Sequence, residues 1–198
     1  VCMLEGMNAR ERLVDATQEL LWEQGYAATS PKDILHRAGA GQGSMYHHFA
    51  GKQELAVTAL EASAAAMRSD VEALLDVKRP AMERLIAYLE RQRDSLRGCR
   101  MGRMTYDADV LATPELLAPV SRTLGWLVDT IAEVIRQGID AQEFPASVDA
   151  HQLASMAVAT VQGGYVLARA QWNPAEFDAA VNGAVTLLRA WKNNGHSA

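Results

Sequence analysis

The sequence predicts an all-α protein: an N-terminal domain of three helices followed by a larger C-terminal helical domain. Ala, Leu, Glu, Arg and Gln dominate the chain, and no segment keeps the apolar–polar alternation of a strand. Proline and glycine recur at intervals that can end one helix and begin the next. The 198 residues are enough for one large domain or two small ones.

The helix boundaries follow from capping residues. Asn8 with Glu11 three residues later has the spacing of a capping box, and Ser30 before a proline is a typical N-cap. Gly39 can take the left-handed conformation needed for a tight turn. We therefore expect about nine helices, over residues 9–24, 31–38, 42–49, 52–76, 80–97, 101–111, 114–139, 148–170 and 173–191.

Composition and charge give no sign of export or of membrane insertion. Net charge is −5 and the isoelectric point is about 5.5, so no global basic field indicates a nucleic-acid partner. Two cysteines, Cys2 and Cys99, are too few for a disulfide framework and suit a reducing cytoplasm. No apolar run approaches the roughly 18 residues of a membrane span, and the N-terminal residues lack the apolar core of a signal peptide.

The segments 31–38 and 42–49, joined by a glycine-containing turn, have the size of a helix-turn-helix. At 100° per residue, Met45 and Phe49 share one side of the second segment, which we expect to be buried. The opposite side carries small or hydrogen-bonding residues, namely Gly43, Ser44 and His47, with Tyr46 and His48 flanking. This face suits close approach to a duplex, but geometry alone leaves a plain helical connector equally open.

The stretch 25–55 as a whole closely resembles the N-terminal signature of the tetracycline-repressor (TetR) family of bacterial transcription regulators. The residues that carry the resemblance are Tyr26, Thr29, Ser30, Asp33, Ile34, Ala38, Gly39, Gly43, Ser44, Met45, Tyr46, His48, Phe49 and Lys52. The resemblance implies a homodimer that places two recognition helices in successive major grooves of a palindromic operator. It implies DNA-facing residues Thr29, Ser30, Lys32, Gln42, Gly43, Ser44, Tyr46, His47 and Lys52.

The same resemblance implies a DNA-binding domain over 8–51 and a ligand-binding and dimerisation domain over 52–193. It implies a cavity in the second domain for a small, mostly apolar effector. The candidate ligand-binding residues are Tyr88, Cys99, Met101, Met104, Tyr106, Trp126, Met156, Val161 and Tyr165, and Ile131 is a further candidate. Methionine and aromatic residues at helical spacing are also ordinary core residues, and this alternative stays open.

The last two predicted helices are rich in Ala, Gly and Val and poor in charge. Gly163, Gly164 and Gly183 each lower helix stability by about 1 kcal/mol relative to alanine, which close helix packing can offset. By the resemblance, these helices from two subunits form a four-helix dimer core. The alternative is burial within one subunit.

Residues 1–55 carry five Lys or Arg against seven Asp or Glu, a net charge of −2. DNA-binding modules are usually basic. Four of the acidic residues lie in the helix over 9–24, which could face away from DNA. We therefore expect affinity to rest on few cationic contacts and to depend weakly on salt.

Other residue patterns favour no metal, cofactor or catalytic site. His47 and His48 are adjacent, so on a helix they point about 100° apart and are poorly placed to share a tetrahedral ion. Cys99 is a small buried residue, a pocket residue or a redox-sensitive thiol near arginines. No spacing indicates a nucleophile–base pair, so we expect no enzyme activity.

The sequence thus predicts a dimeric repressor that a small molecule releases from its operator. Two alternatives remain. One is a regulator of the same fold that activates transcription or responds to a protein partner. The other is a helical ligand-binding or enzyme-like protein that no longer binds DNA.

Overall fold

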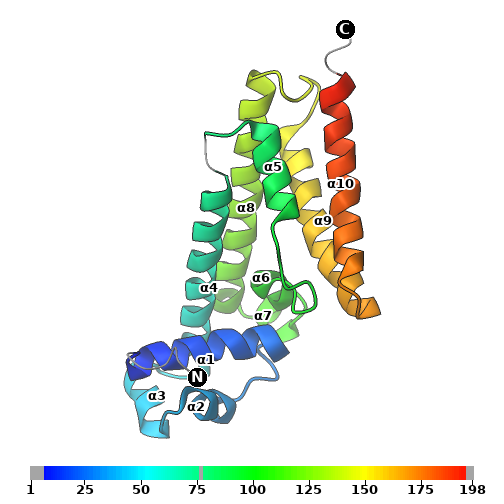
Figure 1. The fold of residues 1–198 in the computed structure, drawn as a ribbon. Coiled ribbons are helices and arrows are strands. Elements are labelled where there is room, and N and C mark those ends of the chain that lie inside the picture. Colours follow the sequence, from blue (N-terminus) through cyan, green and yellow to red (C-terminus); the bar gives the residue numbers. More distant parts are fainter. Residues whose placement is uncertain (1–6, 76–77, 195–198) are drawn as a thin grey trace. The chain divides into compact units, whose positions relative to one another are not determined.

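The computed structural model describes residues 7–75 and 78–194, with side chains up to residue 191, and these residues form ten α-helices and no strand (Figure 1). The predicted all-α class is therefore confirmed. The helices are α1 (Ala9–Gln24), α2 (Pro31–Ala38), α3 (Gln42–His48), α4 (Lys52–Leu74), α5 (Ala81–Glu90), α6 (Arg100–Met104), α7 (Ala108–Ala112), α8 (Pro114–Asp140), α9 (Ala150–Gln171) and α10 (Ala175–Asn194). Residue 76, the predicted end of the fourth helix, and Cys2 lie outside the described residues.

The predicted helix caps of the N-terminal region are confirmed. Asn8 and Glu11 form a reciprocal capping box at the start of α1, and Ser30 and Asp33 form another at the start of α2. Gly39 follows α2 in the left-handed conformation, with φ 57° and ψ 38°. Local side-chain chemistry thus places α2 and α3 at the ends of one short turn.

The helix predicted over 80–97 is shorter, because α5 ends at Glu90. No proline or glycine lies between that residue and Gly98, so the sequence gives no reason for the stop. The guanidinium of Arg93 supplies it by donating hydrogen bonds to the carbonyl oxygens of Leu89 and Arg91, at 2.9 and 2.7 Å, and of Tyr88. A side chain from beyond the helix therefore caps its last turn.

The helix predicted over 101–111 is two helices, α6 and α7. Asp107 lies between them in an extended conformation, and its carboxylate accepts hydrogen bonds from the N–H groups of Asp109 and Val110. The hydroxyl of Thr105 donates to the carbonyl of Gly102 at the end of α6. The two side chains terminate one helix and begin the next, which accounts for the additional helix.

The chain forms two compact units, each built from two segments. The first unit contains residues 1–67 and 99–123, and the second contains residues 68–98 and 124–198. Helices α4 and α8 contribute residues to both units. The domain boundary predicted at residues 51 and 52 remains a prediction.

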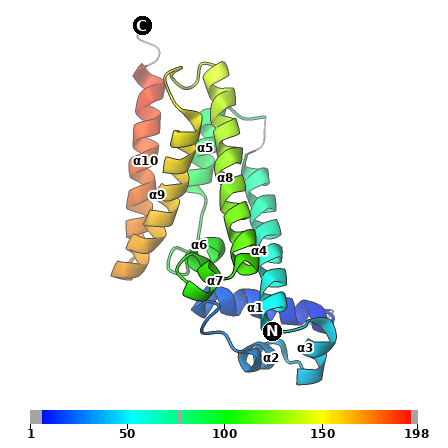
Figure 2. The same cartoon turned by 180° about the vertical axis from the view of Figure 1, so that it is seen from behind.

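The core of the first unit holds α1, α2 and α3 together. Its fully buried side chains include Leu13 of α1, Ile34 of α2, Met45 of α3 and Leu55 of α4, each 0% exposed. Figures 1 and 2 show the two short helices beside α1 from opposite directions. Phe49 is 3% exposed in the same cluster, so the predicted buried face of α3 is confirmed.

In the second unit, α9 and α10 run side by side in both views (Figures 1 and 2). Gly164 lies against Phe177, and a Cβ there would come within 2.9 Å of that ring. The Tyr165 ring stacks on Phe177 with centroids 4.9 Å apart. Gly164 therefore serves packing inside one subunit, whereas a Cβ at Gly163 or Gly183 would meet no atom within 4 Å.

Candidate nucleic-acid interface

Helix α3 divides sharply between a buried and an exposed side. Gln42, Gly43, Tyr46 and His47 are exposed, and the Tyr46 side chain is 54% accessible. Ser44 is half-buried. His48, expected to flank this face, is also exposed, and its ring meets that of His47 edge-on with centroids 4.8 Å apart. Phenol, imidazole and amide groups are thus available on one short helix.

Two glycines at the start of α3, Gly41 and Gly43, make no close packing contact within the chain. Gly41 precedes α3 and Gly43 lies in its first turn, and a Cβ at either position would meet no atom within 4 Å. Gly43 lies inside the helix, where glycine costs roughly 0.5–1 kcal/mol relative to alanine, whereas Gly41 is the N-cap, a position that favours glycine. No packing contact within the chain offsets this cost. Close approach of another molecule to α3 would offset it.

The start of α2 carries a smaller polar surface. The hydroxyl of Ser30 donates to the Asp33 carboxylate at 2.6 Å and accepts from the Asp33 N–H at 3.2 Å. Hydrogen bonds from the side chain and backbone of Ser30 hold the pKa of Asp33 below its ordinary value of 3.8. Lys32 is exposed next to this box. Ser30 is therefore engaged as a cap, and Lys32 leaves its charge at the surface.

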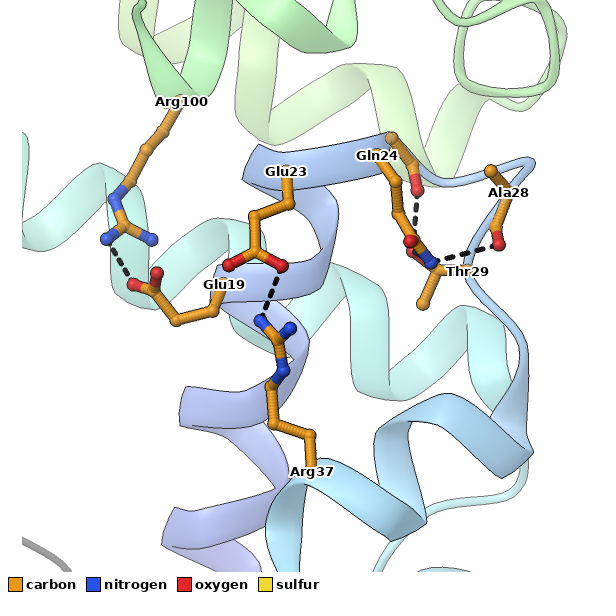
Figure 3. Close-up of polar contacts among 8 residues, drawn as sticks. Glu19, Glu23, Gln24, Ala28, Thr29, Arg37 and Arg100 are labelled. Atoms are coloured by element: carbon orange, nitrogen blue, oxygen red, sulfur yellow. Dashed lines mark hydrogen bonds and ion pairs between the residues drawn. The ribbon is translucent and has the colours of Figure 1, made fainter. Parts of the chain in front are cut away.

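Thr29, predicted to face DNA, is buried at 1% exposure. Figure 3 shows it beside Gln24 and Ala28. Its hydroxyl donates to the carbonyl of Gly25 at 2.6 Å, and the amide of Gln24 reaches over to the Ala28 carbonyl at 3.0 Å. These bonds close the connection between α1 and α2. The Thr29 side chain is used inside the protein, where it is not presented to a duplex.

The ammonium group of Lys52, at the start of α4, also uses one of its donors within the protein. Its ammonium donates to the carbonyl of Tyr26 at 2.7 Å and lies 3.9 Å from the centroid of that ring. Burial lowers the pKa of Lys52, while Asp107 and Asp109 oppose this shift. Burial, and then the same two carboxylates, raise the pKa of Tyr26. Lys52 retains further N–H donors, but its position is fixed by the connection between α1 and α2.

Two of the four acidic residues of α1 are paired with arginines within the first unit. Glu19 accepts from Arg100 at 2.5 Å, and Glu23 accepts from Arg37 at 2.7 Å (Figure 3). The Arg100 guanidinium also lies 4.0 Å from the ring centroid of Trp22. The region is acidic in net charge, but the charges of Glu19 and Glu23 are each balanced by an arginine of the same unit.

Sequence reasoning missed a contact from α7 to the connection between α1 and α2. The carboxylate of Asp107, the N-cap of α7, accepts a hydrogen bond from the backbone N–H of Ala27 at 2.9 Å. Together with the pair of Arg100 and Glu19, it ties α6 and α7 to the helix-turn-helix. An aspartate before a short helical run indicates an N-cap in the sequence. Its contact with Ala27 could not be predicted in this way, because Ala27 lies 80 residues away.

The nine predicted ligand-binding residues fall into three groups. Tyr88, Met101, Met104 and Val161 are buried, as is Ile131; Cys99, Trp126 and Tyr165 are half-buried; Tyr106 and Met156 are exposed. Tyr106 is 76% and Met156 41% accessible, so these two belong to the surface. The set is also divided between the two compact units. Its role in ligand binding remains a prediction.

Two surface hollows are described, both in the second unit, and neither includes any of the nine residues. One, of about 600 Å³, is lined by residues of α5 together with Arg79 and Arg189. The other, of about 510 Å³, lies among residues of α4, α5 and α8. Within the described part of the chain, no group of three or more His, Cys, Asp or Glu side chains is placed to hold a metal ion. No helix of that part has the length and apolarity to cross a membrane.

Comparison with known proteins decides the family. The family model for bacterial regulatory proteins of the tetR family matches residues 13–59, and the model for the tetracyclin repressor-like C-terminal domain matches residues 78–184. The chain belongs to the tetR family. Helices α1 to α3 are therefore its helix-turn-helix region, and the protein is a DNA-binding transcriptional regulator.

Relatives of the tetR-family chain agree with this assignment. It is 29% identical to an HTH-type transcriptional regulator of Mycobacterium tuberculosis over 81% of this chain and 84% of the relative. It is 27% identical to the HTH-type transcriptional activator FasR of Mycolicibacterium smegmatis over 94% and 83% of the two chains. A TetR regulator from Chloroflexus aurantiacus has the same fold, with a TM-score of 0.83 and 27% identity over 94% of this chain and 97% of the other.

Proposed function

We propose that the protein is a homodimeric repressor of the cytoplasm, without enzyme activity, that places α3 of each subunit in the major groove of a palindromic operator. The observation that supports this most is the division of α3. Met45 anchors the helix at 0% exposure, while Tyr46 and His47 beside it are exposed. A recognition helix needs such a buried anchor under an exposed polar face.

The proposed contact surface assigns the predicted DNA-facing residues different degrees of importance. Gln42, Gly43, Ser44, Tyr46 and His47 form its centre, since they lie on one helix and are exposed or half-buried. At its edge, Lys32 is exposed, whereas Ser30 and Lys52 have donors or acceptors already in use. Thr29 is left out of the surface, because its hydroxyl is buried on the Gly25 carbonyl.

The mobility of a DNA fragment from upstream of its own coding region tests this proposal. The protein should retard that fragment, and the double variant Tyr46→Ala with His47→Ala should lose the effect while keeping its oligomeric state. Lys78 is a matched exposed residue of the second unit, and Lys78→Ala should bind as the parent does. Retention of binding by the double variant would place the interface elsewhere.

We also propose that the dimer forms through α9 and α10. Their outer sides expose large apolar side chains, including Val166 and Leu167 at 47% and 46% and Leu187 at 65%. Exposed apolar groups gathered on adjacent helices favour association. Leu187→Asp should give a monomer in sedimentation, while Leu111→Asp, at a leucine of α7 that is 51% exposed, should leave the dimer intact.

The effector is proposed to be small and mostly apolar, bound within residues 52–193, with residues 8–51 as the DNA-binding part. Each compact unit offers buried candidates for an apolar environment: Met101 and Met104 in the first and Tyr88 and Val161 in the second. The contacts of Asp107 with Ala27 and of Arg100 with Glu19 offer a route from α6 and α7 to the helix-turn-helix. Coupling through these contacts requires that the effector favour one of two arrangements.

Activation of transcription is a second candidate mode, favoured by the relative that is named as an activator. A reporter gene under the bound promoter separates the two modes, because deleting a repressor raises its output and deleting an activator lowers it. The remaining alternative, a helical ligand-binding or enzyme-like protein that no longer binds DNA, predicts no retarded fragment at any protein concentration.

A further inference from the structure

One peptide group of the connection between α1 and α2, the group that joins Tyr26 to Ala27, is held from both sides by charged side chains. Its carbonyl oxygen accepts a hydrogen bond from the Lys52 ammonium at 2.7 Å. Its N–H donates to Oδ2 of Asp107 at 2.9 Å. Because the C=O and N–H of a trans peptide point in opposite directions, the cation and the anion lie on opposite sides of this group.

The two hydrogen bonds reinforce each other. A hydrogen bond to an ionised group is roughly twice as strong as a bond between neutral groups. Lys52 withdraws electron density from the carbonyl oxygen, which makes the N–H of the same peptide a better donor to Asp107. All of these residues belong to the first compact unit. Loss of the Asp107 carboxylate should therefore loosen the peptide and the Lys52 ammonium that is bound to it.

Asp107 makes this contact with the oxygen that its own helix does not use. Oδ1 accepts from the N–H groups of Asp109 and Val110, at 3.1 and 3.4 Å, and thereby caps α7. Oδ2 lies so close to the connection that a Cβ at Gly25 would lie 3.0 Å from it. The two oxygens of one carboxylate thus link the start of α7 to the peptide that holds Lys52.

Lys52 is held at two points and keeps donors for a further partner. In addition to its bond to the Tyr26 carbonyl, its ammonium lies 3.9 Å from the centroid of the Tyr26 ring. An ammonium has three N–H donors, so the bond to Tyr26 leaves two for an acceptor outside the chain. A lysine fixed in this way loses less conformational freedom on binding a phosphate than a free surface lysine does. The orientation of the peptide between Tyr26 and Ala27 therefore affects how well Lys52 can contact DNA.

We propose that Asp107 is a positioning residue for DNA binding: through the peptide between Tyr26 and Ala27, it holds Lys52 in place for a phosphate of the operator. The inference rests on the DNA contact proposed above for Lys52. It gives Asp107 an effect opposite to that of its charge alone. A negative charge near the interface repels DNA, so removing the charge should strengthen binding, whereas removing the positioning contact should weaken it.

Retardation of the DNA fragment from upstream of the coding region separates these two effects. Asp107→Ser keeps an N-cap for α7, because serine is as favourable there as aspartate, but it lacks the second oxygen for Ala27. It should weaken DNA binding at least fivefold. Asp109→Asn removes a charge that acts on Lys52 but leaves the Asp107 contact in place, so it should bind as tightly as the parent or more tightly. Asp149→Ser is the same change at the N-cap of α9, in the second unit, and should bind as the parent does.

A double-mutant cycle tests whether Asp107 acts through Lys52. Lys52→Met keeps most of the length of the side chain but removes its donors, so it should itself weaken binding at least fivefold. In the Lys52→Met protein, Asp107→Ser should then weaken binding by less than a further factor of about two, because the residue it positions is already gone. A merely structural role of Asp107 would lower the affinity by the same factor in both backgrounds.

Heteronuclear NMR of the full-length protein without DNA tests the contact itself. In Asp107→Ser, hydrogen exchange of the Ala27 amide should be at least tenfold faster, because its N–H loses the acceptor, and the side-chain signals of Lys52 should shift. The midpoint of chemical denaturation should stay close to that of the parent, since α7 keeps its cap.

Any of three results overturns the inference alone: parental DNA affinity of Asp107→Ser, an equal loss in both backgrounds of the cycle, or parental exchange at Ala27. Failure of the parent protein itself to retard the fragment overturns the proposed function and the inference with it.

Discussion

Replacing Met45 with alanine tests whether the buried side of α3 holds this helix on the protein. The side chain is 0% exposed and belongs to the cluster that contains Leu13, Ile34 and Phe49. Truncation of a fully buried methionine to alanine typically costs about 2–5 kcal/mol, as lost transfer free energy plus the cavity that remains. We expect a loss in that range, which is a large share of the roughly 5–15 kcal/mol that stabilises a domain.

Hydrogen exchange read by mass spectrometry gives this loss locally. Peptides from α1, α2 and α3 should exchange faster in Met45→Ala, by a factor of about 30 or more, because every 1.4 kcal/mol changes an opening equilibrium tenfold. Peptides from α9 and α10, in the other compact unit, should exchange as in the parent.

The neighbouring residue supplies the control. Tyr46 is 54% exposed on the same helix, and surface substitutions usually change stability by no more than about 0.5 kcal/mol. Tyr46→Ala should therefore leave exchange in α1 to α3 near the parental rate. Equal protection in Met45→Ala and the parent would refute the assignment of the buried face.

Three further outcomes follow from the same region. Gly39→Ala should lower the free energy of unfolding by about 1–2 kcal/mol in chemical denaturation, because φ is 57° there. The cost is conformational, since no atom lies within 4 Å of the added Cβ. Gly39→Asn should lower the free energy of unfolding less than Gly39→Ala, and an equal loss in both variants would argue for a steric cause. The pKa of Asp33 is lowered by hydrogen bonds from the side chain and then the backbone of Ser30, so its contribution to stability is present above the ordinary value of 3.8 and is lost as pH falls through the folded value. Denaturation midpoints against pH should show this loss, and Ser30→Ala should reduce it, because the backbone N–H of residue 30 still donates to the Asp33 carboxylate. The logarithm of DNA affinity should fall with the logarithm of salt concentration at a slope no steeper than about −4 for a dimer, because few free cations line the surface; a slope near −10 would contradict this.

The caps and the faces of the short helices could be predicted from the sequence because both depend on neighbours in the chain. The capping boxes at Asn8 and Ser30, the left-handed Gly39 and the buried Met45 need only a spacing of one to four residues. The sequence also contained enough of the family signature to identify the helix-turn-helix.

The features that escaped prediction depend on residues distant in sequence or on which side of a helix faces inward. The end of α5 is set by Arg93, which folds back onto three carbonyls, and no local breaker signals this. Thr29 is polar and next to a helix start, yet the closed connection buries it. Tyr106 and Met156 have the spacing of core residues, but spacing cannot distinguish an inner side from an outer one.

Hydroxyl-radical footprinting of the protein on DNA from upstream of its own coding region tests the central claim most directly. A homodimer that reads DNA with two copies of α3 should protect two half-sites about 10 base pairs, or one helical turn, apart. The Tyr46→Ala and His47→Ala double variant should protect neither. A single unpaired region of protection, or a footprint that persists in the double variant, would contradict the account.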